Sequence, residues 1–257
     1  MPKWVAILPV YNEESHIRNL IPVLQKWVSE DMAERAVVCV DDGSTDKTRE
    51  ILERAGLRVI SSDPLRHRNL GKAQAFAAGA KFADKVDAKI VVSLDADILD
   101  PTAEKITSLA REIERSKFNM LVATQLEPTV VRFPGSAPKM EYQVIGTPYT
   151  GPRAIKMSAL TPLLNRNPKW ISLFKGFAIE VALEHLIPNK SRSQVSFYTD
   201  KGFRKGRRKQ NRQIRTAIRK IEQRDGLCSK LREFRKTNRA FAKNYLAEMK
   251  KKHHHMR

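Results

Sequence analysis

Short apolar runs alternate with amphipathic stretches along the first 125 residues of the chain. The apolar runs predict strands at 4–8, 36–40, 57–61, 89–94 and 119–124. The amphipathic stretches between them predict helices near 14–28, 46–55, 70–85 and 102–116. Strands that alternate with helices are typical of a parallel sheet with crossover helices, so the pattern predicts an α/β fold.

The regular alternation stops near Glu127. Four prolines between 126 and 148 predict a long irregular segment over 126–152. Beyond it, the pattern predicts two helices and a strand, near 154–165, 176–187 and 194–198. These elements would complete the main domain.

Positive charge is concentrated at the C-terminal end of the chain. The whole chain has 48 Lys and Arg against 28 Asp and Glu, a formal net charge of +20. Residues 201–257 hold 21 of the basic and 4 of the acidic side chains, so this segment alone carries +17. We therefore expect a nearly neutral α/β domain over 1–203 and a basic helical extension over 204–257.

The extension has only narrow apolar stripes. Ile214, Ala217, Ile218 and Ile221 recur at the spacing of one helix face, and most other positions are basic or polar. Such helices are typical of a segment that lies on anionic lipid headgroups. They are also compatible with binding to nucleic-acid phosphates, or with a solvated helical hairpin packed on the main domain.

Composition sets two further expectations. No run approaches the ~20 consecutive apolar residues that span a bilayer, so we expect no membrane-spanning segment. The two cysteines, Cys39 and Cys228, are too few for a disulfide framework. Together these features predict a cytoplasmic protein, peripheral on the cytoplasmic membrane face if the basic extension binds lipid.

The fourth predicted strand ends in two carboxylates, Asp95 and Asp97, separated by one residue. Ligands of open α/β sheets bind beyond the carboxyl ends of strands, where these acids would lie. Carboxylates suit Mg²⁺ or Mn²⁺, which prefer oxygen ligands and often bridge to substrate phosphates. The alternative is that both acids only cap the helix that follows.

The first two predicted strands also end in polar residues. Asp41 and Asp42 follow the second strand, where an acid can bond a base or a ribose; Asp-Asp-Gly-Ser is equally good turn chemistry. After the first strand, Tyr11 can stack on a base and Glu13 can bond it. Because the ends of parallel strands share one sheet edge, we expect all these side chains to converge there.

Together these segments resemble family 2 glycosyltransferases, and most closely the dolichol- or polyprenol-phosphate mannosyl- and glucosyltransferase branch. The segments that carry the resemblance, within about residues 3–205, are Pro9-Val10-Tyr11-Asn12-Glu13-Glu14, Val40-Asp41-Asp42-Gly43-Ser44-Thr45-Asp46, Gly71-Lys72-Ala73, Ala77-Ala78-Gly79 and Asp95-Ala96-Asp97. The resemblance implies a GT-A (Rossmann-like) fold, with a mixed, mostly parallel sheet and helices on both faces. It also implies an inverting, metal-dependent transfer from a nucleotide-diphosphate sugar.

The resemblance assigns donor roles to matching residues. Those that would hold the nucleoside are Pro9, Tyr11, Glu13, Asp41 and Asp42, with Lys72 nearby. Asp95 would contact the ribose or the metal, and Asp97 would ligate the Mg²⁺ or Mn²⁺ on the diphosphate.

Three later segments would serve the phosphates and the acceptor. Arg153, in Thr150-Gly151-Pro152-Arg153-Ala154, would contact phosphate, and so would Arg204 in its basic, glycine-containing segment. Glu180 would face the acceptor. The chain departs from the branch at Leu99, where a polar side chain is common, at Pro152, which replaces an aromatic, and over 126–148.

Three functions follow as hypotheses. The first is a peripheral membrane enzyme that transfers a hexose from a UDP- or GDP-sugar to a polyprenyl phosphate, an acceptor already anionic at neutral pH. The second is a soluble glycosyltransferase with a saccharide or small phosphorylated acceptor, whose hydroxyl would need Glu180 as base. The third is a nucleic-acid-binding protein with a degenerate nucleotide-sugar domain, which the intact carboxylate set disfavours.

Overall fold

The computed structural model of the chain describes residues 1–131, 139–144, 152–166 and 178–198. The chain divides into two units, Met1–Ile214 and Arg215–Arg257, and every described residue belongs to the first. The basic helical extension predicted over 204–257, and its boundary with the main domain, lie outside the described residues and stay predictions.

Strands and helices alternate in the first half of the unit. In chain order these elements are β1 (Trp4–Val10), α1 (Glu14–Ser29), β2 (Arg35–Asp41), α2 (Thr48–Arg54), β3 (Val59–Ser61), α3 (Lys72–Lys85), β4 (Ile90–Ser93) and α4 (Ala103–Arg115). The second half contains β5 (Met120–Val131), β6 (Lys139–Val144), β7 (Arg153–Lys156), α5 (Met157–Arg166), α7 (Ala178–Leu186) and β8 (Lys190–Tyr198).

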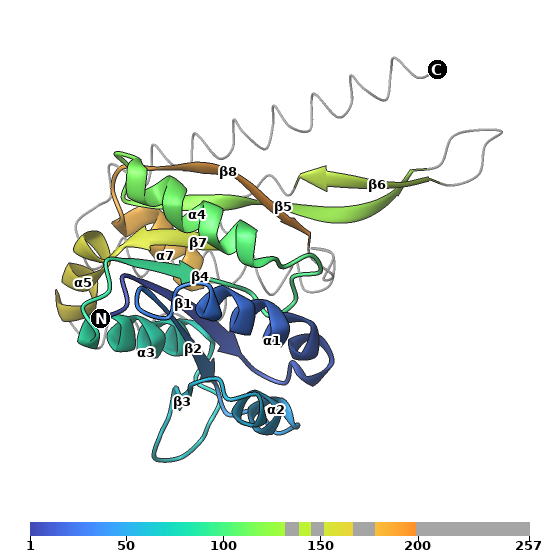
Figure 1. Ribbon diagram of the computed structural model, residues 1–257, viewed down its shortest axis with the longest axis vertical. Helices are drawn as coiled ribbons and strands as arrows, with labels where there is room; N and C mark the ends of the chain where they lie inside the picture. The colour runs from blue at the N-terminus through green and yellow to red at the C-terminus, as the bar shows by residue number, and fades with distance from the viewer. Residues whose placement is uncertain (132–138, 145–151, 167–177, 199–257) are drawn as a thin grey trace. The chain divides into compact units, whose positions relative to one another are not determined.

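The strands form one mixed sheet in the order β3-β2-β1-β4-β7-β5-β6, and β8 also pairs with β5 (Figure 1). The pairs β1–β2, β2–β3, β1–β4 and β5–β8 are parallel. Strand β7 is inserted antiparallel between β4 and β5, and β6 is antiparallel to β5. The predicted mixed, mostly parallel sheet is confirmed.

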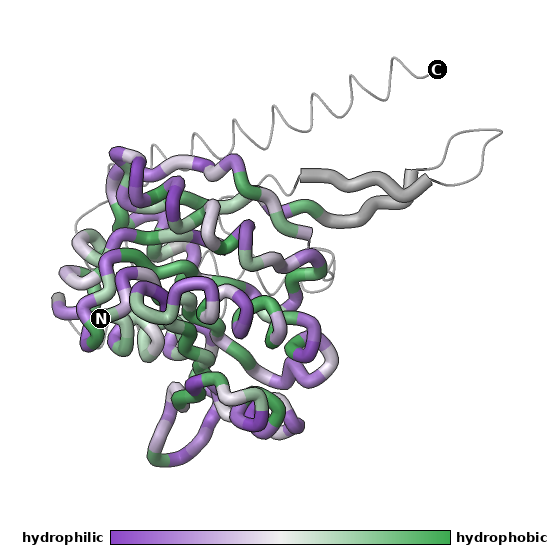
Figure 2. Tube along the Cα trace, viewed as in Figure 1, coloured by the Kyte–Doolittle hydropathy of each residue, from purple (hydrophilic) through white to green (hydrophobic). Residues whose placement is uncertain are grey.

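Helices cover both faces of the sheet. Alternate residues of a strand point to opposite faces, and Ala6 and Leu8 of β1 belong to a buried cluster with α1 and α4 side chains such as Trp27 and Leu109. Ile7, between them, faces α3 instead. Figure 2 shows the result as hydrophobic colour along the central strands and mixed colour along the helices.

Helix α3 approaches the sheet closely because Gly79 has no side chain. A Cβ built on Gly79 would lie 2.4 Å from Ile7 Cγ2 and 3.2 Å from Val40 Cγ2. Both contacts are with stiff β-branched side chains, so the neighbours have little freedom to move aside. The glycine therefore sets the spacing between α3 and the strands that carry the candidate site.

Replacing Gly79 by alanine should destabilise the domain although alanine favours helices. We expect a loss of about 1–2 kcal/mol in the free energy of unfolding, because overpacking of about 1–3 kcal/mol exceeds the helix-propensity gain. Urea denaturation measures the change, with Lys81→Ala on the exposed side of α3 as the control, expected within about 0.5 kcal/mol of the parent. A Gly79→Ala variant as stable as the parent would contradict the close packing.

Two expectations about the second half were wrong. The segment 126–152 is not wholly irregular, because β5 continues to Val131 and pairs with β6 through Leu126↔Val144 to Val131↔Lys139. Its β-branched and aromatic residues favour strands and outweigh Pro128. The helix predicted from 154 begins only at Met157, because the residues before it are paired with both β4 and β5 as β7.

The remaining elements lie within a few residues of their predicted bounds. Among the described residues, none of the helices combines the length and apolar character that crossing a bilayer requires.

Candidate active site

The carboxyl ends of β1, β2 and β4 lie at one edge of the sheet. The register pairs Val10 with Asp41 across β1 and β2, and Ile7 with Ser93 across β1 and β4. Strand β7 runs antiparallel to β4, so it begins at this edge, with Arg153 paired to Ser93. The sheet therefore brings Pro9, Asp41 and Arg153 to one edge, and the loops after β1, β2 and β4 add the other predicted donor residues there except Lys72. Lys72 and Glu180 lie on helices α3 and α7.

The loop after β1 is tied to the loop after β2. Asn12, in the left-handed region at φ 54°, donates its backbone N–H to Ser44 Oγ (3.1 Å), and its Oδ1 accepts from Thr45 N (2.8 Å). The Glu13 backbone N–H donates to Thr48 Oγ1 (2.8 Å). These bonds fix the first turn of α1 against α2, so Asn12 positions both loops.

Tyr11 and Glu13 flank this junction. Tyr11 is 43% exposed, which leaves its ring accessible to a planar ligand. Glu13 is half-buried, and its Oε2 lies 2.9 Å from His16 Nδ1. Pro9, the second-last residue of strand β1, is also half-buried.

Asp41 and Asp42 are both buried but have different surroundings. Asp41 Oδ1 accepts from Ser44 N (3.0 Å), and Arg49 Nη1 lies 3.7 Å from its other oxygen. Asp42 accepts three bonds, from Ser62 Oγ (2.5 Å), Leu70 N (3.0 Å) and Gly71 N (2.7 Å). Asp42 therefore holds the 62–71 loop and the start of α3. A direct contact between Asp42 and a nucleoside stays a prediction.

Gly43 allows the 62–71 loop to lie against the end of β2. It has φ +77°, and a Cβ there would lie 2.6 Å from His67 O and 2.7 Å from Arg68 C. Both contacts are with backbone atoms, so a side chain at this position would displace the loop.

Lys72 bridges two carboxylates that lie far apart in the sequence. Its Nζ lies 2.6 Å from Asp95 Oδ1, in the loop after β4, and 2.7 Å from Glu180 Oε1, on α7. Burial lowers the pKa of Lys72, but the charges of Asp95 and Glu180 outweigh burial and hold that pKa above its ordinary value. Glu180 is buried, and its Oε2 has no hydrogen-bond partner among the described residues.

Asp95 and Asp97 suit a divalent cation that arrives with phosphates. Both side chains are half-buried in the loop after β4. Within the described parts of the chain, no group of three or more His, Cys, Asp or Glu side chains is placed to hold a metal ion. Mg²⁺ typically uses one or two carboxylates together with substrate phosphates and water, so this pair fits it.

Arg153 is a buried cation with unused donors. It is 2% exposed, and its Nη1 and Nη2 have no hydrogen-bond partner among the described residues. A buried charge whose hydrogen-bond donors stay unused is costly, so the two free donors of Arg153 at this edge indicate an anionic ligand.

Two charged residues near Arg153 were not predicted from the sequence. Arg192 and Arg153 both pair with Val122, from β8 and from β7. Burial raises the pKa of Glu184 on α7 despite the nearby Lys190, Arg153 and Arg192, and burial lowers the pKa of Arg192. The sequence alone carries no signal for them, because β8 pairs with β5, which lies far from it in the chain, and α7 carries Glu184 from a third segment.

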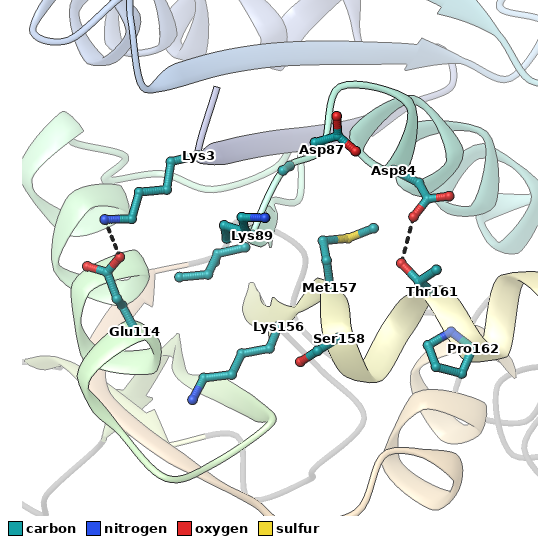
Figure 3. A pocket seen from close by; sticks show the side chains of 12 residues that line it. Lys3, Asp84, Asp87, Lys89, Glu114, Lys156, Met157, Ser158, Thr161 and Pro162 are labelled. Carbon is teal, nitrogen blue, oxygen red and sulfur yellow. Dashed lines mark hydrogen bonds and ion pairs between the residues drawn. The ribbon is translucent and has the colours of Figure 1, made fainter. Parts of the chain in front are cut away.

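The structure also has a cavity of about 620 Å³ at the other edge of the sheet, where β4 begins. Lys3 and Glu114 at its wall form an ion pair of 2.7 Å, and Thr161 donates to Asp84 over 2.7 Å (Figure 3). The cavity is separated from Asp95 by the length of β4 and contains none of the predicted site residues. We therefore place the candidate site at the carboxyl edge.

The sequence profile of the family described as glycosyl transferase family 2 matches residues 5–174, about two thirds of the chain. The chain belongs to glycosyl transferase family 2. This membership covers β1 to β7 and every predicted site residue except Glu180 and Arg204. Arg204 lies outside the described residues.

Two curated relatives of this family 2 protein each match part of it. An uncharacterized glycosyltransferase of Synechocystis sp. is 31% identical over 149 residues, which cover 54% of this chain and 43% of the relative. An undecaprenyl-phosphate 4-deoxy-4-formamido-L-arabinose transferase of Edwardsiella ictaluri is 33% identical over 103 residues, which cover 38% and 30%. The chain thus spans less than half the length of these relatives.

The fold is shared with a solved GT-A enzyme. Glucosyl-3-phosphoglycerate synthase from Mycobacterium tuberculosis, crystallised with Mn²⁺, UDP and glucosyl-3-phosphoglycerate, superposes with a TM-score of 0.60. The match covers 88% of this chain and 80% of that one at 17% identity. The predicted GT-A fold of this family 2 protein is therefore confirmed.

Proposed function

We propose that this chain transfers a hexose, with inversion and with the help of Mg²⁺ or Mn²⁺, from a nucleotide-diphosphate sugar to a polyprenyl phosphate. The observation that carries the proposal is the convergence of Asp41, Asp95 and Arg153 at one sheet edge. Arg153 is buried there, and its terminal nitrogens have no hydrogen-bond partner among the described residues. Tyr11, Asp41 and Glu13 bind the nucleoside, with Pro9 and Asp42 shaping the site. Asp95 and Asp97 would hold the metal.

In this proposal, the metal-binding and basic residues stabilise the leaving group. A departing nucleoside diphosphate gains negative charge, which the bound metal would neutralise as a Lewis acid. Arg153 offers two guanidinium nitrogens to the same phosphates from a buried position, where the interaction is strong. Arg204 adds a second basic contact in this proposal. No step so far needs a general base.

The names of some relatives support the polyprenyl phosphate acceptor. These relatives are called undecaprenyl-phosphate 4-deoxy-4-formamido-L-arabinose transferases. A phosphate monoester, with a second pKa near ~6, is already largely ionised at neutral pH. The second candidate is a hydroxyl acceptor, favoured by Glu180, whose buried Oε2 has no partner among the described residues and is available to accept a proton.

The variant Glu180→Gln separates the two acceptor classes. With undecaprenyl phosphate as acceptor, we expect turnover to fall less than about tenfold, because the nucleophile is already an anion. With a hydroxyl acceptor such as phosphoglyceric acid, the loss of a general base should cost about 10²–10⁴-fold. Transfer of radiolabelled sugar from UDP- and GDP-hexoses measures both.

Glu104→Gln, on the exposed surface of α4, is the matched control and should retain the parent rate with either acceptor. If neither acceptor is glycosylated by the parent protein with any donor, the proposed reaction is wrong.

The lipid acceptor implies a peripheral membrane location on the cytoplasmic face, supported by the +17 charge of residues 201–257. We expect the full chain to sediment with phosphatidylglycerol vesicles at low salt. Binding should be lost near 1 M NaCl, where the Debye length is about 3 Å, and should be absent with neutral phosphatidylcholine vesicles.

Failure to bind anionic vesicles at low salt would favour the soluble enzyme with a small acceptor. Stronger retention on RNA than on these vesicles would favour the nucleic-acid hypothesis.

A further inference from the structure

Lys72 lies at a position that is electrostatically unfavourable for a cation. It is the first residue of α3, whose N-terminal end carries partial positive charge, and the first turn of α3 contains no acidic residue. Its side chain is only 29% exposed, so it is also partly removed from water. The carboxylates of Asp95 and Glu180 therefore stabilise the positive charge of Lys72 at this position.

The two contacts connect separate parts of the site. Asp95 follows β4 on the proposed metal side, and Glu180 lies on α7 on the proposed acceptor side. Their side chains are 16% and 4% exposed, so two acids would repel each other without a cation between them. Charge-assisted bonds of 2.6 and 2.7 Å show that Lys72 neutralises both.

We propose that Lys72 is a positioning residue that acts as an internal counter-cation, competing with the divalent metal for Asp95 until the diphosphate arrives. A metal ion at Asp95 would lie beside the ammonium on Oδ1, and the two positive charges would repel each other unless the ammonium moves away. The ammonium keeps its bond with Glu180, so it remains beside the site. Without phosphates the competition weakens metal binding; the negative charge of the diphosphate then favours the metal. Metal binding is thereby coupled to donor binding.

This inference rests on the proposed metal site, and it is tested by Mn²⁺ affinity rather than by turnover. Electron paramagnetic resonance of unbound Mn²⁺ gives the affinity of the substrate-free protein, with and without UDP or GDP. We expect Lys72→Met to bind Mn²⁺ at least about tenfold more tightly than the parent without nucleotide, because the competing charge is gone. The added effect of the nucleotide should shrink accordingly.

Lys72→Arg retains the charge and should keep the parent affinity within about threefold. A purely structural role predicts the opposite sign for Lys72→Met, because a displaced Asp95 binds metal more weakly. Equal or weaker Mn²⁺ binding by folded Lys72→Met, checked by circular dichroism, would overturn the inference. If Lys72→Met does not fold, Lys72→Met combined with Glu180→Gln removes the repulsion and must show the same tightening. Absence of Mn²⁺ binding by the parent, even with nucleotide, would instead refute the proposed metal site.

Discussion

Replacing Asp97 by asparagine should reduce sugar transfer by at least about 10³-fold while leaving the fold intact. Asp97 is half-buried in the loop after β4, and the described residues supply no third acidic, His or Cys ligand that could replace it. The change preserves shape but removes the charge that holds Mg²⁺ or Mn²⁺ on the diphosphate. Loss of that stabilisation costs about 4 kcal/mol of barrier, which corresponds to this factor.

The matched control is Asp87→Asn, the same substitution at an exposed position at the opposite edge of the sheet. Asp87 has φ 52°, a conformation that asparagine also adopts, so this variant should fold and retain the parent rate. Initial rates with the best donor, at saturating Mn²⁺, measure both variants. An Asp97→Asn variant with more than about a tenth of the parent rate would show that the carboxylate is not a metal ligand.

Replacing Arg153 by methionine should lower transfer by at least about 100-fold without destabilising the ligand-free protein. The guanidinium is buried and its terminal nitrogens make no hydrogen bond to the described residues, so we expect it to contribute little to the stability of the ligand-free protein. Removing a phosphate contact in a buried site typically costs about 10²–10³-fold. Exchanging a buried cation with unused donors for an apolar side chain of similar length removes its desolvation cost.

Rates and thermal unfolding, each with and without nucleotide, test this expectation together. Arg111→Met on the exposed side of α4 is the control and should change neither quantity. A ligand-free Arg153→Met protein that melts well below the parent would show that Arg153 mainly stabilises the fold, through its interaction with Glu184.

The sequence predicts the half of the site that lies on parallel strands. Asp41 and Asp95 follow apolar runs directly, and strand ends share one edge once the α/β alternation is recognised. The bridge from Lys72 to Glu180 was beyond prediction, because it depends on where α7 packs. The antiparallel β7 was equally beyond prediction, because a four-residue strand is too short to show a period.

The β5–β6 hairpin shows a second limit of sequence reasoning. Prolines between 126 and 148 predicted an irregular segment, yet Pro128 lies within β5, opposite Tyr142 of β6. Proline removes only one donor from a strand, while valine and threonine beside it favour the extended backbone. Likewise, Asp42 was predicted from its neighbours in sequence to touch the donor. Its three bonds to the 62–71 loop became visible only in the folded chain.

The central claim is that residues at one edge of the sheet bind a nucleoside diphosphate through a divalent cation. Thermal unfolding with UDP and with GDP, each with and without Mn²⁺, tests it most directly. One nucleotide should raise the Tm by at least about 5 °C at 100 times its Kd, only with Mn²⁺, and not in Asp97→Asn. The account would be contradicted if the parent and Asp97→Asn showed the same change in Tm with each nucleotide, whether or not Mn²⁺ is present.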